Sequence, residues 1–232
     1  MEAASHETIG STAERILTVA TTLFAEHGYH GLSMRVLAAA VGLNVATIHY
    51  HTGSKQELYQ AVFRHLAERE RAIIAAHTQH VTDDDIADPV AFRRRLTSLI
   101  DALVDLTIEQ PEIPRLWLRR WLEREESPAA VEAEVSLPLY DMALNLLQQA
   151  QAVGTISVKG IDLQLILTGF VWILYGYFAG SPLDAAGKRV DPTAPERVVA
   201  FKRFLHAYAA RMLGLPDDLA TDQAPCTRPS RR

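Results

Sequence analysis

Apolar residues recur three and four positions apart along most of the 232-residue chain, which is the period of an amphipathic α-helix. The alternation of apolar and polar residues that marks a half-buried strand is not convincing in any segment, and no internal repeat is visible. We therefore predict an all-α fold. The expected helices cover, within the usual uncertainty of helix ends, residues 11–27, the segment between Ser33 and Gly42, and residues 45–51, 54–80, 89–109, 112–125, 127–152, 161–180 and 194–213.

Capping signals fix the predicted start of several helices. Ser11 with Glu14, and Ser54 with Glu57, have the spacing of a capping box, in which side chain and backbone satisfy each other's free groups. Ser33 and Asn44 can each cap the short helix that follows. These signals predict that helices begin directly after Ser11, Asn44 and Ser54.

Helix-breaking residues predict where the segments end. Gly28 offers a stop for the first helix. The acidic stretch 82–88 is expected to be a loop and is the best candidate for a boundary within the chain. Asp88 and Pro89 then provide a cap and a first helical residue, while Pro138 is expected to kink or divide its helix.

Residues 33–55 carry the most specific pattern. Two short helical segments flank Gly42, a residue that accepts the left-handed backbone of a tight turn, and the small residues 38–40 allow the helices to approach closely. This arrangement is typical of a helix-turn-helix, whose second helix carries polar tips into the major groove of DNA. On geometry alone, an ordinary helical hairpin with Gly42 as a simple C-cap is the more common explanation.

A family resemblance favours the helix-turn-helix. The residues that carry it span about 11–62 and stand in register along that segment. They are Ile16, Ala20, Phe24, Gly28, Tyr29, Ser33, Arg35, Leu37, Ala38, Ala40, Gly42, Leu43, Ala46, Thr47, Ile48, Tyr50, His51, Gly53, Ser54, Lys55, Leu58 and Tyr59. This segment resembles the DNA-binding domain of the TetR family of bacterial transcriptional regulators.

The resemblance implies an N-terminal three-helix helix-turn-helix domain and a C-terminal helical ligand-binding and dimerisation domain. We expect the DNA-binding domain over residues 1–55, with a long linking helix over 54–80, and the regulatory domain over 56–215. Residues 216–232 form a tail that contains Pro and Arg and is expected to be mobile.

The resemblance also assigns roles to individual residues of the DNA-binding domain. We expect base-edge contacts from the start of the second short helix and phosphate contacts from its end, from the first turn of the long helix and from the residues around 33–35. The predicted DNA-binding residues are Ser33, Arg35, Asn44, Val45, Ala46, Thr47, His49, Tyr50, His51 and Lys55. The chain departs from the family pattern at Thr52, where an aromatic residue is usual, and at His49, where Tyr is commoner. Thr52 is expected to weaken the anchoring of the recognition helix.

The C-terminal half resembles the family only in its layout of helices. An effector pocket is expected to be apolar with few polar groups, although the same aromatic residues could simply fill a core. The predicted pocket residues are Trp117, Trp121, Tyr140, Met142, Phe170, Trp172 and Tyr175. The last two long helices are expected to pair across a homodimer, with Gly169, Ile173, Gly176, Gly180, Phe201, Leu205 and Tyr208 at the interface. Effector binding would then change the packing of helix 54–80 and the spacing of the two DNA-binding domains in the dimer, which we call the reading heads.

Charge and composition limit these expectations. The net charge is −5, which gives no hint of a nucleic-acid partner, and residues 1–80 contain six Lys or Arg against seven Asp or Glu. Binding to a palindromic operator in double-stranded DNA is therefore expected to depend on a few well-placed groups and to have a shallow salt dependence. Eight of the nine His lie in that region, and their protonation is a further hypothesis for DNA affinity.

Other classes of protein fit less well. Residues 163–180 are apolar enough for a membrane-associated or adaptor protein, but their length is at the lower limit for a span and no Lys or Arg cluster flanks them. No nucleophile-elbow, P-loop or dinucleotide fingerprint supports an enzyme. The sequence predicts no cofactor, no metal site and no signal peptide, and the single Cys226 fits a reducing cytoplasm.

Overall fold

The computed structural model describes residues 3–122, 129–158 and 160–216, and within these ranges the fold is helical, as predicted. Its one extended feature there is an isolated bridge between Leu183 and Arg189. The helices are α1 (Ala3–Gly31), α2 (Met34–Val41), α3 (Val45–Thr52), α4 (Lys55–Thr78), α5 (Asp83–Ala87), α6 (Pro89–Glu109), α7 (Glu112–Leu122), α8 (Ala129–Ala152), α9 (Leu163–Gly180) and α10 (Pro195–Leu213).

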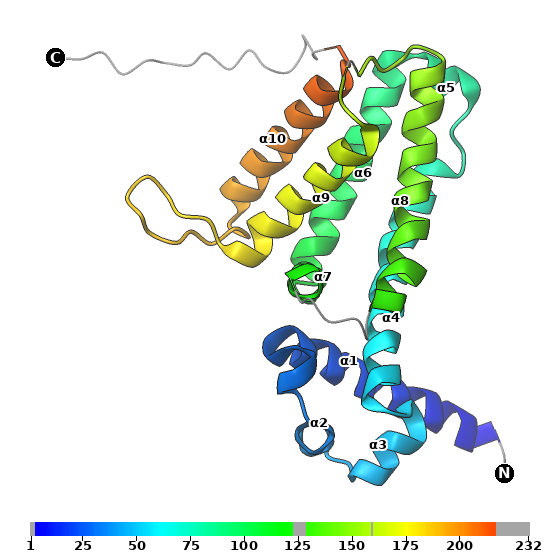
Figure 1. The fold of residues 1–232 in the computed structure, drawn as a ribbon, viewed down its shortest axis with the longest axis vertical. Helices are drawn as coiled ribbons and strands as arrows, with labels where there is room; N and C mark the ends of the chain where they lie inside the picture. The colour runs from blue at the N-terminus through cyan, green and yellow to red at the C-terminus, as the bar shows by residue number, and fades with distance from the viewer. Residues whose placement is uncertain (1–2, 123–128, 159, 217–232) are drawn as a thin grey trace.

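The helices of the molecule form two groups. Figure 1 shows α1, α2 and α3 gathered at one end, α6, α8, α9 and α10 at the other, and α4 running from the first group into the second. The helix α4 packs against α1 in the first group and against α6 and α8 in the second. The helix α7 also packs against both groups, through α1 and α9.

The caps of α2, α3 and α4 are confirmed. The hydroxyl of Ser33 accepts a hydrogen bond from the backbone nitrogen of Val36 at 3.2 Å, which starts α2. Both halves of the predicted capping box at the start of α4 are formed by Ser54 and Glu57. Because these caps satisfy the first free N–H groups of each helix, they place the helix starts within one residue of the prediction.

The predicted ends of the first helix are wrong in part. The helix α1 begins at Ala3, so that Ser11 lies inside it, because residues 3–10 contain no proline and a single glycine costs only about 1 kcal/mol in a helix. Its other end agrees better with the prediction: Gly28 has φ 72° and ψ 177° and interrupts the helix, which resumes for one turn to Gly31.

The acidic stretch 82–88 is not a loop throughout, since Asp83–Ala87 form the short helix α5. Thr82 and Asp85 make a capping box, and the three acidic residues occupy the first turn. Negative charge at a helix N-terminus is favourable, so the acidic run stabilises a helix start where we predicted none.

Two further predictions concern α8. The helix continues through Pro138, which therefore does not divide it. Pro138 is exposed, so water can satisfy the carbonyl that loses its helical partner. The predicted start at Ser127 and Pro128, like residues 123–125 of the preceding segment, Cys226 and most of the tail, lies outside the described residues.

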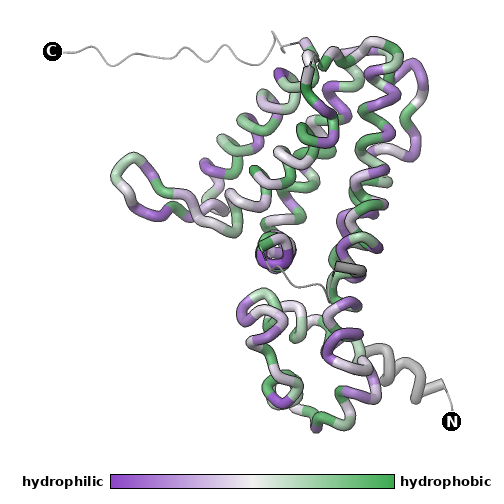
Figure 2. The backbone as a smooth tube through the Cα atoms, viewed as in Figure 1, coloured by the Kyte–Doolittle hydropathy of each residue, from purple (hydrophilic) through white to green (hydrophobic). Residues whose placement is uncertain are grey.

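The main hydrophobic core runs through both groups of helices. It includes Ile16 and Phe24 of α1, Phe63 of α4, Trp117 of α7 and Leu205 of α10. A second cluster of buried residues lies among α5, α6, α8, α9 and α10. Figure 2 shows hydrophobic and hydrophilic bands alternating along the helices, as expected where one face of each helix is buried. The group formed by α1, α2 and α3 and the rest of the chain are therefore joined by packed side chains.

The helix α9 is the one described helix long and apolar enough to cross a membrane by length and composition, although only 28% of its residues are buried within this chain. The same test is passed by helices of soluble proteins whose apolar faces are covered by other surfaces. The low burial shows that much of α9 is left uncovered by the chain's own helices.

Candidate nucleic-acid interface and ligand cavity

The turn between α2 and α3 is fixed by Gly42, whose φ of 78° and ψ of 33° are left-handed. Its backbone nitrogen donates to the carbonyl of Ala38 at 3.0 Å, and the nitrogen of Leu43 donates to the same carbonyl at 2.9 Å. An L-residue with a side chain rarely adopts this backbone conformation. Glycine at this position thus sets the angle at which α3 leaves α2.

The helix α3 is held at its start and along its inner face. The side-chain oxygen of Asn44 accepts hydrogen bonds from the backbone nitrogen of Thr47 at 2.8 Å and from its hydroxyl at 3.0 Å. Ile48 has no exposed surface and anchors the helix in the core. The hydroxyl of Thr47 is therefore already bound to Asn44, and this hydrogen bond fixes the direction of the Thr47 methyl group. The side chain of Thr47 is half-buried.

The outer face of α3 carries the predicted reading residues. Ala46, His49 and Tyr50 are exposed, and 79% of the surface of Tyr50 is open to solvent. The Nδ1 atom of His49 lies 2.8 Å from the carbonyl oxygen of Gly53, which fixes the ring while the side chain stays exposed. Val45 and His51 are half-buried at the edges of this face.

Thr52 does not loosen the helix in the way its polarity predicts. Its hydroxyl donates to the carbonyl of Ile48 at 2.9 Å, one turn earlier, and its side chain is half-buried. A hydroxyl satisfied within its own helix can be buried at little cost. The hydrophobic anchoring of α3 comes from Ile48.

Predicted phosphate contacts flank α3 on both sides. On one side Ser33 and Arg35 are exposed at the start of α2. On the other side is Lys55, in the first turn of α4. Its ammonium group lies 4.6 Å from the ring centre of Tyr29 in α1. This cation–π contact holds the positive charge next to the helix N-terminus, where an anion is also favoured by the helix dipole.

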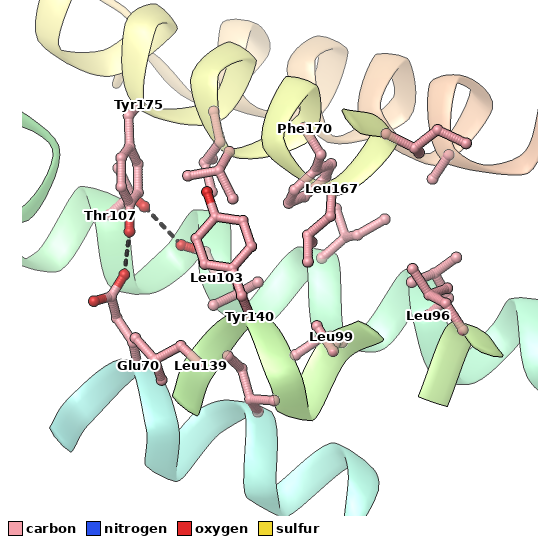
Figure 3. A pocket seen from close by; sticks show the side chains of 18 of the residues that line it. Glu70, Leu96, Leu99, Leu103, Thr107, Leu139, Tyr140, Leu167, Phe170 and Tyr175 are labelled. Atoms are coloured by element: carbon pink, nitrogen blue, oxygen red, sulfur yellow. Dashed lines mark hydrogen bonds between the residues drawn. The ribbon is translucent and has the colours of Figure 1, made fainter. Parts of the chain in front are cut away.

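A cavity of about 140 Å³ lies in the second group of helices, between α4, α6, α7, α8, α9 and α10. Most of the side chains that line it are aliphatic or aromatic, and Figure 3 shows them converging from facing helices. The one charged residue among the described residues that line it is Glu70 of α4. The cavity therefore combines an apolar wall with a single ionisable carboxyl group.

Glu70 is buried and accepts hydrogen bonds from two aromatic side chains. The indole nitrogen of Trp117 donates to Oε2 at 3.2 Å, and the hydroxyl of Tyr175 donates to Oε1 (Figure 3). Burial raises the pKa of Glu70 to about 7, although the hydrogen bonds from Tyr175 and Trp117 act in the opposite direction. The group is thus poised to change its charge near neutral pH.

A series of ring contacts connects the end of α1, beside the start of α4, with this carboxyl group. The ring centres of Tyr29 and Tyr59 are 5.0 Å apart, those of Tyr59 and Phe63 are 4.9 Å apart, and those of Phe63 and Trp117 are 4.8 Å apart. We call Tyr29, Tyr59, Phe63 and Trp117 the aromatic series. It begins under Lys55 and ends at the indole that binds Glu70.

Comparison with known proteins agrees with the geometry of α2 and α3. Residues 16–62 match the family described as bacterial regulatory proteins, tetR family. Residues 16–62 are therefore a DNA-binding domain of the TetR family. The all-α fold and the helix-turn-helix predicted from the sequence are confirmed, and the enzyme alternative is excluded by the regulators that the chain matches.

Curated relatives and solved structures extend the similarity beyond the TetR DNA-binding domain. The HTH-type transcriptional regulator UidR of Escherichia coli K12 is 25% identical over 148 residues, which cover 63% of this chain and 69% of UidR. The HTH-type transcriptional repressor AcnR of Corynebacterium glutamicum is 33% identical over 75 residues, which cover 32% of this chain and 40% of AcnR. AibR, solved in complex with isovaleryl coenzyme A and operator DNA, has a TM-score of 0.65 at 16% identity and covers 88% of this chain and 100% of its own. The last similarity concerns the fold alone.

The predicted pocket residues of this chain fall into two groups. Trp117, Trp121, Tyr140, Phe170 and Tyr175 line the cavity. Two others, Met142 and Trp172, are not among its lining residues, because each follows a lining residue by two positions and so points about 200° around the helix from it. Lining the cavity does not by itself make any of these residues a ligand contact, and those roles stay predictions.

The sequence interpretation missed Glu70, although a signal was present. Leu58, Val62, Leu66, Glu70 and Ile74 follow one another at intervals of four along α4, and all five are buried. A carboxylate at the fourth position of an otherwise apolar stripe is a buried charge, which is rare without a function or partner.

The predicted interface residues lie partly on the outside of the chain and partly inside it. Ile173, Gly176 and Phe201 line a shallow groove between α9 and α10 on the outside of the chain, and Gly180 is exposed at the end of α9. Leu205 has no exposed surface. Its position on the inner stripe of α10 leaves nothing for a partner to contact.

The other two predicted interface residues meet inside the chain. Tyr208 lines the cavity, and a side chain added at Gly169 would lie 3.2 Å from the hydroxyl of Tyr208. The residues that face outward on these helices are instead Trp172, Val199 and Phe204, which are 43%, 52% and 50% exposed.

No group of three or more His, Cys, Asp or Glu among the described residues is arranged to hold a metal ion. His77, near the end of α4, has its Nδ1 atom 2.8 Å from the carbonyl oxygen of Ile73 and its Nε2 atom 3.3 Å from the hydroxyl of Ser98. These contacts explain the position of His77 within the helical packing.

Proposed function

We propose that this chain is a ligand-responsive repressor that binds a palindromic operator as a homodimer and loses DNA affinity when a small molecule enters the cavity. The observation that carries the proposal is the position of Glu70, which lies in the cavity wall on the same helix, α4, that begins at the reading head. AcnR is named a repressor, which supports repression as the effect on transcription. AibR was solved with a small molecule and operator DNA, which supports these two kinds of ligand. Since its target is the genome, the regulator would act in the cytoplasm.

The exposed face of α3 supports major-groove reading. Ala46 and Val45 offer apolar contact to thymine methyl groups, and His49 offers a ring that can donate or accept at a base edge. Arg35, Tyr50 and Lys55 flank this face and would contact the phosphates on either side.

The outer faces of α9 and α10 support a homodimer. Trp172 and Phe204 are exposed large apolar residues that line a groove between the two helices, and exposed apolar patches of this kind are typical of interaction sites. A two-fold axis through this face would present two reading heads, which requires a palindromic operator.

The coupling is proposed to pass through α4 and α7. Both helices contribute to the cavity wall, through Glu70 and Trp117, and both pack against α1. A ligand that moves either helix would reposition the reading heads relative to each other. Such a ligand changes DNA affinity only if it binds the two arrangements unequally.

The experiment that tests the function is selection of bound duplexes from a random DNA pool by the purified full-length chain. Enrichment of a palindrome supports the proposal, and the absence of any enriched sequence refutes it. The variant Ala46→Glu places a negative charge on the exposed face of α3 and is expected to abolish enrichment. Ala76→Glu, at an exposed alanine of α4, is the matched control and should enrich the same palindrome.

A further inference from the structure

We propose that the cavity selects small lipophilic amines, with the protonated nitrogen paired to the Glu70 carboxylate and a ring-sized apolar group in the remaining space. This inference rests on the proposed function, because it names the class of effector for the same cavity. It is carried by the charge of the lining, by the aromatic groups around Glu70 and by the cavity volume.

The charge of the lining excludes anionic effectors. Among the described residues that line the cavity there is no Lys, Arg or His, and the only titratable groups besides Glu70 are Tyr140, Tyr175 and Tyr208. A carboxylate or phosphate entering the cavity would therefore meet one like charge and no opposite charge. Isovaleryl coenzyme A, the ligand in the AibR complex, is an anion of this kind, so the shared fold does not carry its ligand over to this chain.

The groups that face Glu70 from the neighbouring helices do not neutralise it. From α7 it meets Trp117 and from α9 it meets Tyr175, and both are neutral hydrogen-bond donors. Burial raises the pKa of Tyr175 and of Tyr140 on α8 above the usual value, so both stay uncharged near neutral pH. The buried Arg120 of α7 is paired with Glu132 at 3.5 Å, and no cationic residue among those described lines the cavity. A protonated ligand would therefore supply the positive charge that the lining lacks.

Aromatic rings surround the place that such a cation would occupy. The ring centre of Trp121 lies 6.0 Å from that of Trp117 and 5.8 Å from that of Tyr175, and all three residues line the cavity together with Tyr140. The faces of aromatic rings attract ammonium groups, and this attraction is stronger in a site without water. The rings therefore favour a protonated amine over a neutral alcohol of the same shape.

The cost of burying a carboxylate supports the same conclusion. A buried charge without a partner is unfavourable, and burial raises the pKa of Glu70 to about 7. An ammonium group next to the carboxylate would reverse part of that cost and hold the group ionised. A neutral ligand offers the carboxylate no such compensation.

The volume limits the size of the ligand. A dry apolar cavity of about 150 Å³ holds one benzene ring, and this cavity has about 140 Å³. A ring with a short aminoalkyl arm fits without rearrangement. A larger amine must push α4, α7 or α8 outward, which is the movement that the proposed coupling requires.

The test uses three ligands of similar size with the full-length chain: benzylamine, benzyl alcohol and benzoate. We expect calorimetry at pH 8 to give benzylamine a Kd at least tenfold lower than that of benzyl alcohol and no detectable binding of benzoate. Benzylamine affinity should also rise from pH 6 to pH 8, as Glu70 ionises, while benzyl alcohol affinity should not rise. Equal affinity for the amine and the alcohol, or binding of none of the three, would overturn the proposal, and this comparison needs no variant.

Variants then assign the preference to one residue. Glu70→Gln should weaken benzylamine at least tenfold, keep benzyl alcohol within about threefold and remove the pH dependence. Glu68→Gln, at an exposed glutamate of the same helix, should behave as the unmodified chain. A Glu70→Gln protein that keeps the amine preference contradicts the assignment.

The failure of this inference is distinguishable from failure of the proposed function. A chain that enriches a palindrome but prefers benzyl alcohol is a regulator with a different effector class. A chain that prefers benzylamine but enriches no DNA has the proposed cavity chemistry without the proposed function.

Discussion

The indole nitrogen of Trp117 donates a hydrogen bond to the Glu70 carboxylate across 3.2 Å, and this contact joins α7 to α4 inside the cavity wall. The same α7 is fastened to α1, because Arg119 donates to the carbonyl of Glu26 at 3.2 Å and lies against Gly28. Gly28 is required by its φ of 72°, and a side chain there would also displace the Arg119 guanidinium, which would lie 2.7 Å away. Glu70 thus links α4 to α7, and both of these helices pack against α1.

The first prediction concerns the pH dependence of folding. The pKa of Glu70 is about 7 in the folded chain against 4.5 for an unperturbed carboxyl group, because it is buried. Between these values the folded state binds more protons than the unfolded state, so this group's contribution is fully present below pH 4.5 and is lost as pH rises through 7. The loss is about 3 kcal/mol.

Urea unfolding from pH 5 to pH 8 measures this effect. Relative to the unmodified chain, Glu70→Gln should become more stable as pH rises, because the amide never ionises. Glu68→Gln should track the unmodified chain across the range. A constant difference between Glu70→Gln and the unmodified chain would show that Glu70 does not titrate in this window.

The second prediction concerns the aromatic series. Phe63 has no exposed surface and stands between Tyr59 and Trp117, so Phe63→Leu removes both ring contacts while keeping an apolar side chain. We expect benzylamine affinity to change less than threefold, whereas the benzylamine-induced drop in operator affinity should shrink at least threefold.

Phe92→Leu is the control for the second prediction. Phe92 is equally buried, but it lies in the second hydrophobic cluster, away from the aromatic series. Both variants are expected to lose about 1 kcal/mol of stability from the change of shape. An equal loss of coupling in both would mean that general softening of the core, rather than the aromatic series, is responsible.

The third prediction concerns the homodimer. Phe204 is 50% exposed beside the groove of α9 and α10, and Phe204→Glu would place a charge at the centre of the proposed interface. Sedimentation should change from dimer to monomer at micromolar concentration, and operator affinity should fall at least a hundredfold because each half-site then binds alone. Leu137→Glu, at a residue of α8 that is 57% exposed, should leave the dimer intact. If the Phe204→Glu protein remains a dimer, the interface lies on another face of the chain.

The reading head was predictable from the sequence because its signals are local. The turn at Gly42 and the caps at Ser33, Asn44 and Ser54 each depend on residues at most five positions away. The acidic run before residue 89 was misinterpreted, because the same residues that suit a loop also cap and charge a helix start.

The cavity and the interface were only partly predictable, because they depend on how distant helices turn toward one another. A shift of two positions in a helix separates Tyr140 and Phe170, which line the cavity, from Met142 and Trp172, which do not. In α10 the predicted stripe that includes Leu205 faces the chain's own core, so the exposed face lies around Phe204 instead. Periodicity identifies a face of a helix, but it does not say which partner covers that face.

The last prediction concerns salt dependence. Lys55 lies over the ring of Tyr29 in the first turn of α4, the position proposed for a phosphate contact. Lys55→Met keeps most of the apolar stem and removes the charge, so it should weaken all DNA sequences to a similar degree. For a dimer that loses two such contacts, the slope of log affinity against log salt should become less steep by about 2. Lys188→Met, in the loop between α9 and α10, should leave the slope unchanged. A Lys55→Met protein with an unchanged slope but lower affinity would mean that Lys55 positions Tyr29 and α4 rather than contacting phosphate.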